Sequence, residues 1–435
     1  MQSCRSAAPG SDSLRPPPPP APRALAPNAP NALRRSNGNG VHARRGGRMT
    51  SVACTRLDGG SSSSSSVVAV QQQVVEGSDG KRGTLRELAE ELRRAGEQEV
   101  PRSYEVGEEE RPTVRHDEFA DLPVIDLALV HSDRRELSRQ LGEAAREWGF
   151  FQIVNHGLSL AALHDIETQG FKFFELPSES KLKLEQHGYF KDNTAVKMSS
   201  LHWAESWMLS YSPQSNIDEK INLLFPDGNP ALRNAINRFC EASERINEMI
   251  LELLAEHLGL ATDFFSQHLN AKRSLGLRMN YYPACPQPSH VLGANVHTDG
   301  SSLTVLQQDK VGGLQIHRDG RWFGVKPIHG ALVVNVGDAL HAWTNGHFKS
   351  VLHRVVLNKE VHRLSLAAFL NVDNSLALSA PDELVDEAHP RLYRPFTFGD
   401  YIQQVLRARA EEKSSSKSMM DGNRILAGLR FDPGP

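Results

Sequence analysis

The sequence of 435 residues predicts a mixed α and β fold, with a rolled, antiparallel β core flanked by helices. Residues 293–308 are expected to be extended chain, and residues 350–357 form a β-branched apolar run typical of a buried strand. Two shorter strand-like runs, residues 314–317 and 331–336, lie between them. Turn signals such as Asp319-Gly320 and Asn345-Gly346 separate these runs. Short strands joined in this way favour a sheet that rolls back on itself.

Four stretches with helical periodicity are expected to flank this core. Residues 83–96 and 132–148 carry apolar residues at helical spacing among charged ones. The clearest helix covers residues 239–260, where apolar side chains form a broad face that we assign to the core rather than to a ligand site. The chain returns to helix at residues 397–409. It then enters the serine-rich segment 413–417, which is expected to be a mobile tail.

The first 85 residues differ in composition from the rest of the chain. They contain a proline run at 16–20 and a serine run at 61–66, and such a segment buries too little apolar surface to fold. We therefore expect residues 1–85 to be a disordered extension. Residues 1–50 contain many arginines, no lysine and a single acid, which resembles an organellar transit peptide. A cytoplasmic location is predicted, with the chloroplast as the alternative.

Composition excludes several classes of partner. The net charge of −3 gives no basic footprint for nucleic acid, and no apolar run approaches the length of a membrane span. The four cysteines have no metal-binding spacing and are interpreted as reduced thiols of an intracellular protein. We expect a monomer that binds a small molecule and neither nucleic acid nor membrane.

Three residues in the strand-like region form a candidate metal site. His297 and Asp299 are two positions apart, so in an extended chain they project to the same face. His353 lies in the β-branched run that the rolled sheet would bring back to them. A His-x-Asp pair alone is common, but two histidines and one carboxylate in this order suit a non-haem Fe(II) site with open positions. Arg363 and Ser365 follow, and an arginine fork can hold a carboxylate of a dicarboxylic acid.

These residues lie within longer motifs, and the chain from about residue 119 to 405 resembles the plant 2-oxoglutarate- and Fe(II)-dependent dioxygenases. The motifs that carry the resemblance are residues 122–127, 147–157, 280–288, 297–299, 308–315, 334–338, 350–355 and 363–365. The resemblance implies a double-stranded β-helix, or jelly roll, flanked by helices. It also implies Fe(II), the co-substrate 2-oxoglutarate and O2, with ascorbate supporting activity.

The resemblance assigns a role to each matching position. Its iron ligands correspond to His297, Asp299 and His353. In the family, an arginine and a serine hold the distal carboxylate of 2-oxoglutarate, and these correspond to Arg363 and Ser365. The tyrosine that hydrogen-bonds the same carboxylate corresponds to Tyr282, and Asn280 lies near the metal. The expected organisation is an amino-terminal dioxygenase region at 119–225, a helical connector at 226–272, the catalytic core at 273–375, and a C-terminal helix with a mobile tail at 376–435.

Substrate preference rests on weaker signals. Residues 342–346, 361–365 and 393–401 look similar to gibberellin 2-oxidases. The resemblance gives three candidate substrate contacts. Phe369 matches a position that packs on substrate in flavonoid-oxidising members, Tyr189 lies in the segment that closes the mouth of the barrel in relatives, and Arg278 is a cation placed to meet a polar group of the substrate. The predicted function is hydroxylation of a hydrophobic small molecule. The preferred substrate is a gibberellin-type diterpenoid, which the reaction would inactivate. A flavonoid or phenylpropanoid hydroxylase is the alternative enzyme, and a non-catalytic binding or sensing protein on the same fold is the alternative from another class.

Overall fold

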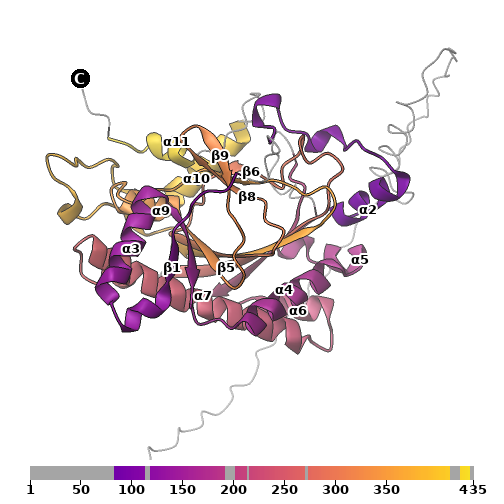
Figure 1. The fold of residues 1–435 in the computed structure, drawn as a ribbon, viewed down its shortest axis with the longest axis horizontal. Coiled ribbons are helices and arrows are strands. Elements are labelled where there is room, and N and C mark those ends of the chain that lie inside the picture. The colour runs from indigo at the N-terminus through magenta and orange to yellow at the C-terminus, as the bar shows by residue number, and fades with distance from the viewer. Residues whose placement is uncertain are drawn as a thin grey trace, which may run out of the picture. The chain divides into compact units, whose positions relative to one another are not determined.

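The computed structural model describes residues 83–112, 118–191, 201–212, 215–269, 273–411 and 422–431 (Figure 1). The chain divides into two units, residues 1–60 and 61–435, and every described element belongs to the second. The expectations for the extension before residue 83, for its likeness to a transit peptide and for the tail at 413–417 lie outside the described residues.

An eight-stranded sheet forms one wall of the core. Its strand order is β1-β2-β10-β7-β12-β5-β4-β3, and every pair is antiparallel except β1 with β2. The strands are β1 (Val124–Asp126), β2 (Phe150–Val154), β10 (Leu332–Val336), β7 (Leu303–Gln308), β12 (Arg363–Val372), β5 (Arg273–Tyr282), β4 (Glu205–Ser212) and β3 (Tyr189–Phe190).

A four-stranded antiparallel sheet forms the other wall, in the order β6-β11-β8-β9. Its strands are β6 (Ala294–His297), β11 (His353–Val355), β8 (Leu314–Arg318) and β9 (Arg321–Gly324). Non-consecutive strands pair in both sheets, which confirms the rolled antiparallel core that the sequence predicts. This is the jelly-roll arrangement that the resemblance implies.

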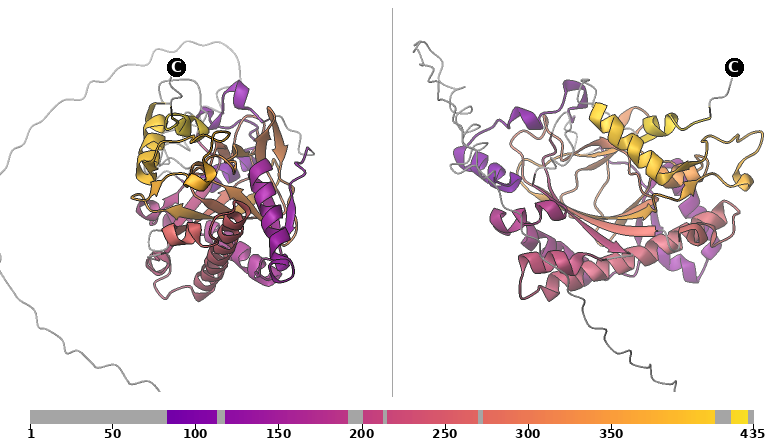
Figure 2. Two further views of the ribbon diagram at one scale, coloured as in Figure 1. Left: turned by 90° about the vertical axis from the view of Figure 1, so that its left-hand side faces the viewer. Right: turned by 180° about the vertical axis from the view of Figure 1, so that it is seen from behind.

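Helices cover the outer face of the large sheet, as Figures 1 and 2 show for α3, α4 and α7. Alternate residues of β5, β7 and β12 pack against them in one apolar core, while the residues between point to the other face. The helices before the core strands are α2 (Leu85–Ala95), α3 (Arg134–Glu147), α4 (Leu160–Phe174), α5 (Ser178–Leu182), α6 (Ile217–Leu224), α7 (Pro230–His257) and α8 (Phe264–Leu269). No helix of the described residues has the length and apolar character needed to cross a membrane.

The long helix α7 begins nine residues before its predicted start at 239. Asn229 caps it, because its side chain accepts a hydrogen bond from Leu232 N at 3.1 Å, and Pro230 occupies the first turn. The apolar stripe continues back through Ile236, Ala235 and Leu232, so the predicted start at 239 left out two turns that the periodicity itself supports. The other predicted helices agree with the structure to within two residues at each end.

The amino-terminal helix α2 is an integral part of the fold. Thr84 caps it in a capping box with Glu87, and its buried side chains, among them Leu85, pack beside Tyr282 and Trp203. Thr84 and Leu85 are therefore buried residues of the folded protein. The expected boundary of the extension at residue 85 lies too late, because the cap Thr84 and the first helical residue Leu85 already belong to the folded region.

The C-terminal region contains more structure than one helix and a tail. Helix α9 (Asp338–Trp343) lies between β10 and β11. After β12 come a two-stranded ribbon, β13 (Ala377–Leu378) with β14 (Phe396–Thr397), and helices α10 (Phe398–Glu411) and α11 (Gly422–Ala427). Leu426 and Leu429 are buried in the main core. Residues 422–431 are thus packed, which corrects the expectation of a mobile tail for this part of the chain.

Candidate metal and co-substrate site

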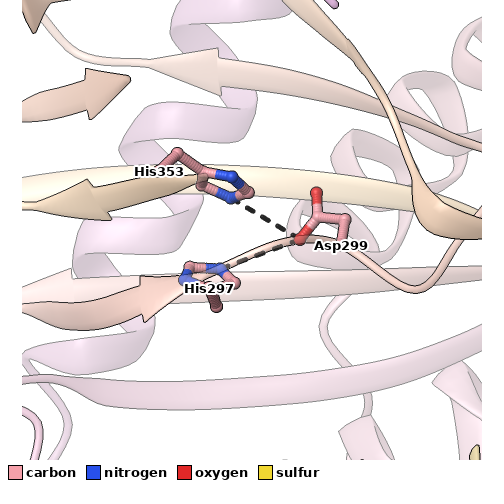
Figure 3. Close-up of side chains that lie close together, drawn as sticks. All are labelled: His297, Asp299 and His353. Atoms are coloured by element: carbon pink, nitrogen blue, oxygen red, sulfur yellow. Dashed lines mark ion pairs between the residues drawn. The ribbon is translucent and has the colours of Figure 1, made fainter. Parts of the chain in front are cut away.

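The three predicted metal ligands converge between the two sheets (Figure 3). His297 ends β6 and His353 begins β11, and the two are direct partners in the antiparallel ladder. Asp299 follows β6, and its Oδ1 lies 3.7 Å from His297 Nε2 and 3.6 Å from His353 Nε2. We call these three residues the metal triad. They form the one group of this kind among the described residues whose ligand atoms lie close enough to share an ion.

Both imidazole rings are oriented by backbone carbonyls. His297 Nδ1 lies 2.7 Å from Asn295 O and His353 Nδ1 lies 3.1 Å from Val351 O. A carbonyl only accepts, so each Nδ1 carries the proton and each Nε2 presents a lone pair towards Asp299. Burial, and then the neighbouring His353, lower the pKa of His297. The ring is therefore neutral at neutral pH, the form that binds a metal.

The carboxylate of Asp299 is held by one of its two oxygens. Oδ2 accepts hydrogen bonds from Thr304 Oγ1 at 2.7 Å and from Asn335 Nδ2 at 2.8 Å, two residues that face each other across β7 and β10. Burial alone would raise the pKa of Asp299, but the two histidines and these two donors lower it below its usual value. Oδ1 is left to face the histidines, and one oxygen with two imidazole nitrogens is a donor set that fits Fe(II).

A buried arginine lies in the same cavity. Arg363 begins β12, is 3% exposed, and lies over the ring of its strand partner Tyr282 at 4.9 Å. Its Nη2 is 3.4 Å from Gln308 Oε1, while Nε and Nη1 have no hydrogen-bond partner within the described part of the chain. A buried guanidinium with two unsatisfied donors, near Ser365 on the same face of β12, fits the distal carboxylate of 2-oxoglutarate.

The metal triad and this arginine line one cavity of about 310 Å³. Residues at alternate positions of β5 and β12 point into it, as the period of a strand requires. Of the residues predicted from the sequence, it takes in the metal triad, Arg363, Ser365, Tyr282, Asn280, Arg278 and Phe369. It also takes in residues that the sequence did not assign: Phe150, Phe190, His202, Asn295, Thr304, Leu306 and Asn335.

Tyr189 is not part of the cavity, which corrects its assignment as a substrate contact. It is 1% exposed, and its hydroxyl donates to Glu205 Oε2 at 2.6 Å. Glu205 also pairs with Lys181 at 2.7 Å, so Tyr189 belongs to a buried polar cluster outside the cavity. Its neighbour Phe190 lines the cavity instead, because successive residues of β3 point to opposite faces.

Two signals in the sequence point to residues that were missed. Asn335 lies in the motif of residues 334–338, which carried the resemblance but received no role. Thr304 lies at an even spacing from Leu306 in a strand that was recognised, so the strand period places it on the inner face. Neither signal shows that Thr304 and Asn335 both hydrogen-bond Asp299, because that contact depends on the pairing of β7 with β10.

Comparison with known proteins agrees with this geometry. Residues 274–372 match the 2OG-Fe(II) oxygenase superfamily, and residues 122–228 match the N-terminal region described as non-haem dioxygenase in morphine synthesis. Gibberellin 20 oxidase 1 of Oryza sativa subsp. japonica is 35% identical over 350 residues, which cover 76% of this chain and 94% of that protein. The chain belongs to the 2OG-Fe(II) oxygenase superfamily.

Two further relatives of this oxygenase extend the comparison. Gibberellin 2-beta-dioxygenase 8 of Arabidopsis thaliana is 36% identical over 297 residues, covering 66% of this chain and 83% of that protein. The crystal structure of JOX2 in complex with 2OG, Fe, and JA superimposes with a TM-score of 0.66 at 28% identity, covering 80% of this chain and 98% of that one.

The oxygenase is an enzyme that uses Fe(II) and 2-oxoglutarate, which sets aside the non-catalytic alternative. When bound, iron and 2-oxoglutarate together activate O2 for oxidation of a substrate C–H bond. The chain's own contribution is geometric. The metal triad would hold the ion by three donors, and Arg363 would set the direction of the co-substrate. The hydrogen bonds from Thr304 and Asn335 to Oδ2 of Asp299 leave Oδ1 to face the histidines.

Proposed function

We propose that this oxygenase hydroxylates an unactivated carbon of a hydrophobic carboxylic acid, of the gibberellin type. The observation that carries the proposal is the position of Arg278. This cation lines a cavity whose other walls are largely apolar and which contains the metal triad. A pocket of this kind suits an apolar ring system oriented by one placed charge.

Arg278 is well placed to orient an acid against the metal. It lies in the middle of β5, with Ala367 of β12 on one side and Met208 of β4 on the other. Its Nη2 donates to Ser206 Oγ at 3.0 Å, and its charge is close enough to contribute to the lowered pKa of His297. A substrate carboxylate paired with this guanidinium would place the attached ring near the metal triad.

The remaining walls favour a rigid apolar body over a polar one. Phe190 and Phe369 lie on strands of the large sheet, and Val296, Leu306 and Ala367 complete the apolar surface. Burial of a ring system against such side chains supplies about 25 cal/mol for each Å² removed from water. The relatives named for gibberellins support the same class of substrate.

The test compares substrates that differ in one charge. Purified enzyme is incubated with a gibberellin, its methyl ester, a flavanone and a phenolic acid, and succinate and hydroxylated product are measured. Arg278→Met should raise KM for the free acid by about tenfold or more, because a hydrogen bond to a charged group contributes about 1.5–3 kcal/mol. The same variant should leave KM for the ester unchanged. Hydroxylation of the flavanone with no turnover of the gibberellin would refute the proposal.

A cytoplasmic monomer is part of this proposal, with the chloroplast as the alternative compartment. Cys240 and Cys285 are buried free thiols, which supports a reducing compartment inside the cell, a condition that both locations meet. Fluorescent fusions of the full chain and of a chain lacking residues 1–82 would separate the two compartments. If the full chain enters chloroplasts and the shortened chain does not, the chloroplast is the correct compartment. The oligomeric state is measured separately by sedimentation.

A further inference from the structure

The loop that carries Asp299 is attached to two distant parts of the chain through one buried carboxylate. Asp338, the first residue of α9, is fully buried, and its backbone N–H donates to Asp299 O at 2.7 Å. Its Oδ2 accepts a hydrogen bond from Thr298 Oγ1 at 2.8 Å. The same oxygen accepts the hydroxyl of Tyr401 in α10. Asp338 thus links the ligand loop to the C-terminal helix.

Two glycines allow this close approach. A Cβ on Gly337 would lie 2.0 Å from Ser301 O and 3.0 Å from Asp299 O, so no other residue fits between β10 and the loop. A Cβ on Gly300 would lie 3.2 Å from Cε1 of Tyr401. The loop is therefore enclosed between the start of α9 and the Tyr401 ring, with little room to shift.

The first turn of α10 is itself anchored. Phe398 N donates to Leu376 O at 3.1 Å and Gly399 N donates to Asn374 O at 2.9 Å, which ties the helix to the chain just after β12. Thr397 Oγ1 and Asp400 cap the helix, with Thr397 Oγ1 2.7 Å from Asp400 Oδ2. Tyr401, one residue further, is 3% exposed. This helix lies beyond residues 274–372, where the superfamily match ends.

We propose that Asp338 and Tyr401 are positioning residues of the metal site and that α10 thereby belongs to it. The side-chain rotation of Asp299 is held by Thr304 and Asn335, but those contacts leave the position of its backbone open. Asp338 supplies that constraint, because its N–H bonds Asp299 O and its carboxylate bonds Thr298. Tyr401 fixes the carboxylate of Asp338 and so acts on the loop through it. The inference goes beyond the proposed function, because it concerns metal binding and holds for any substrate.

The experiment compares two tyrosines of the same region. Tyr401→Phe removes the hydroxyl that reaches Asp338. The control, Tyr393→Phe, removes a hydroxyl that lies 2.9 Å from His341 Nε2, and Tyr393 is equally buried at 4% exposure. Each variant is purified as the full chain without metal, its melting temperature is recorded, and Co(II) is titrated while the visible absorption of the bound ion is followed.

The two variants should lose similar thermal stability and differ in metal binding. Tyr401→Phe should raise the Co(II) dissociation constant by up to about tenfold, because Tyr401 acts through Asp338 and the effect of changing a direct partner of a ligand begins at about tenfold. The variant should also alter the Co(II) spectrum. Tyr393→Phe should leave both unchanged. Thr298→Val removes the other hydroxyl on Asp338 Oδ2 and repeats the test if Tyr401→Phe does not fold. Unaltered affinity and spectrum in whichever variant folds would overturn the proposal, as would loss of the fold in both.

Discussion

Replacement of Arg363 by lysine tests the co-substrate site most directly. Lysine keeps the charge and much of the length but lacks the planar fork, so it cannot satisfy a carboxylate with two parallel hydrogen bonds. In the structure two guanidinium nitrogens, Nε and Nη1, are buried without a partner within the described chain. A carboxylate of the co-substrate would occupy one fork of the guanidinium, in which either Nε or Nη1 donates beside Nη2.

The magnitude follows from the loss of one of these two hydrogen bonds. A hydrogen bond to a charged group contributes about 1.5–3 kcal/mol, and about 1.4 kcal/mol corresponds to a factor of ten. Arg363→Lys should therefore raise KM for 2-oxoglutarate by about tenfold to about a hundredfold. Iron affinity should change little, because within the described chain Arg363 hydrogen-bonds Gln308 and not the metal triad.

A second buried arginine supplies the control. Arg354 lies on β11 next to His353, is 2% exposed, and already has partners: its Nε donates to Gln315 Oε1 at 2.9 Å and its Nη1 to Glu110 O at 3.1 Å. Arg354→Lys should lower stability and leave KM for 2-oxoglutarate unchanged. Succinate formation at varied 2-oxoglutarate measures KM for both variants. Equal KM in Arg363→Lys and the wild type would refute the assignment.

The other predictions follow from the same contacts. Each alanine substitution in the metal triad should abolish metal binding and turnover while the circular dichroism spectrum is retained; near-normal turnover would exclude that residue as a ligand. Asn335→Leu removes a donor to Asp299 and should weaken Fe(II) binding by about tenfold, measured by titration calorimetry against the wild type. Tyr189→Phe should lower the free energy of unfolding by about 1–3 kcal/mol and leave substrate KM unchanged; an altered KM would restore its role at the cavity. A chain starting at Gly83 should keep full activity, whereas one starting at Val100 lacks α2 and should melt at lower temperature.

The metal triad could be predicted because its information is local and ordered. The strand period places His297 and Asp299 on one face, and the apolar run around His353 identifies a second strand. The motifs then gave the family and its fold. The position of Arg363 in the same cavity could be predicted for the same reason, since it begins a strand with Ser365 two positions on.

Errors arose where a side chain's direction depends on pairing between distant strands. Tyr189 and Phe190 are both aromatic residues near the barrel mouth, and the sequence does not say which of them faces the cavity. The pairing of Tyr189 with Trp207 in β4, and the buried Glu205 that accepts its hydroxyl, put Tyr189 outside the cavity. The same applies to the C-terminal region, where Leu426 and Leu429 have no long apolar pattern around them but are buried.

The sequence by itself determined the rolled sheet and the candidate residues for metal and co-substrate, because strand period and short motifs depend on neighbouring residues. Only the tertiary structure decided which residues surround them. Asn335 and Thr304 reach Asp299 through the pairing of β7 with β10, and Tyr401 reaches Asp338 from a helix 63 residues away in sequence. A hydrogen bond requires its two atoms to lie about 3 Å apart, and for residues this distant in the chain only the folded backbone brings them together.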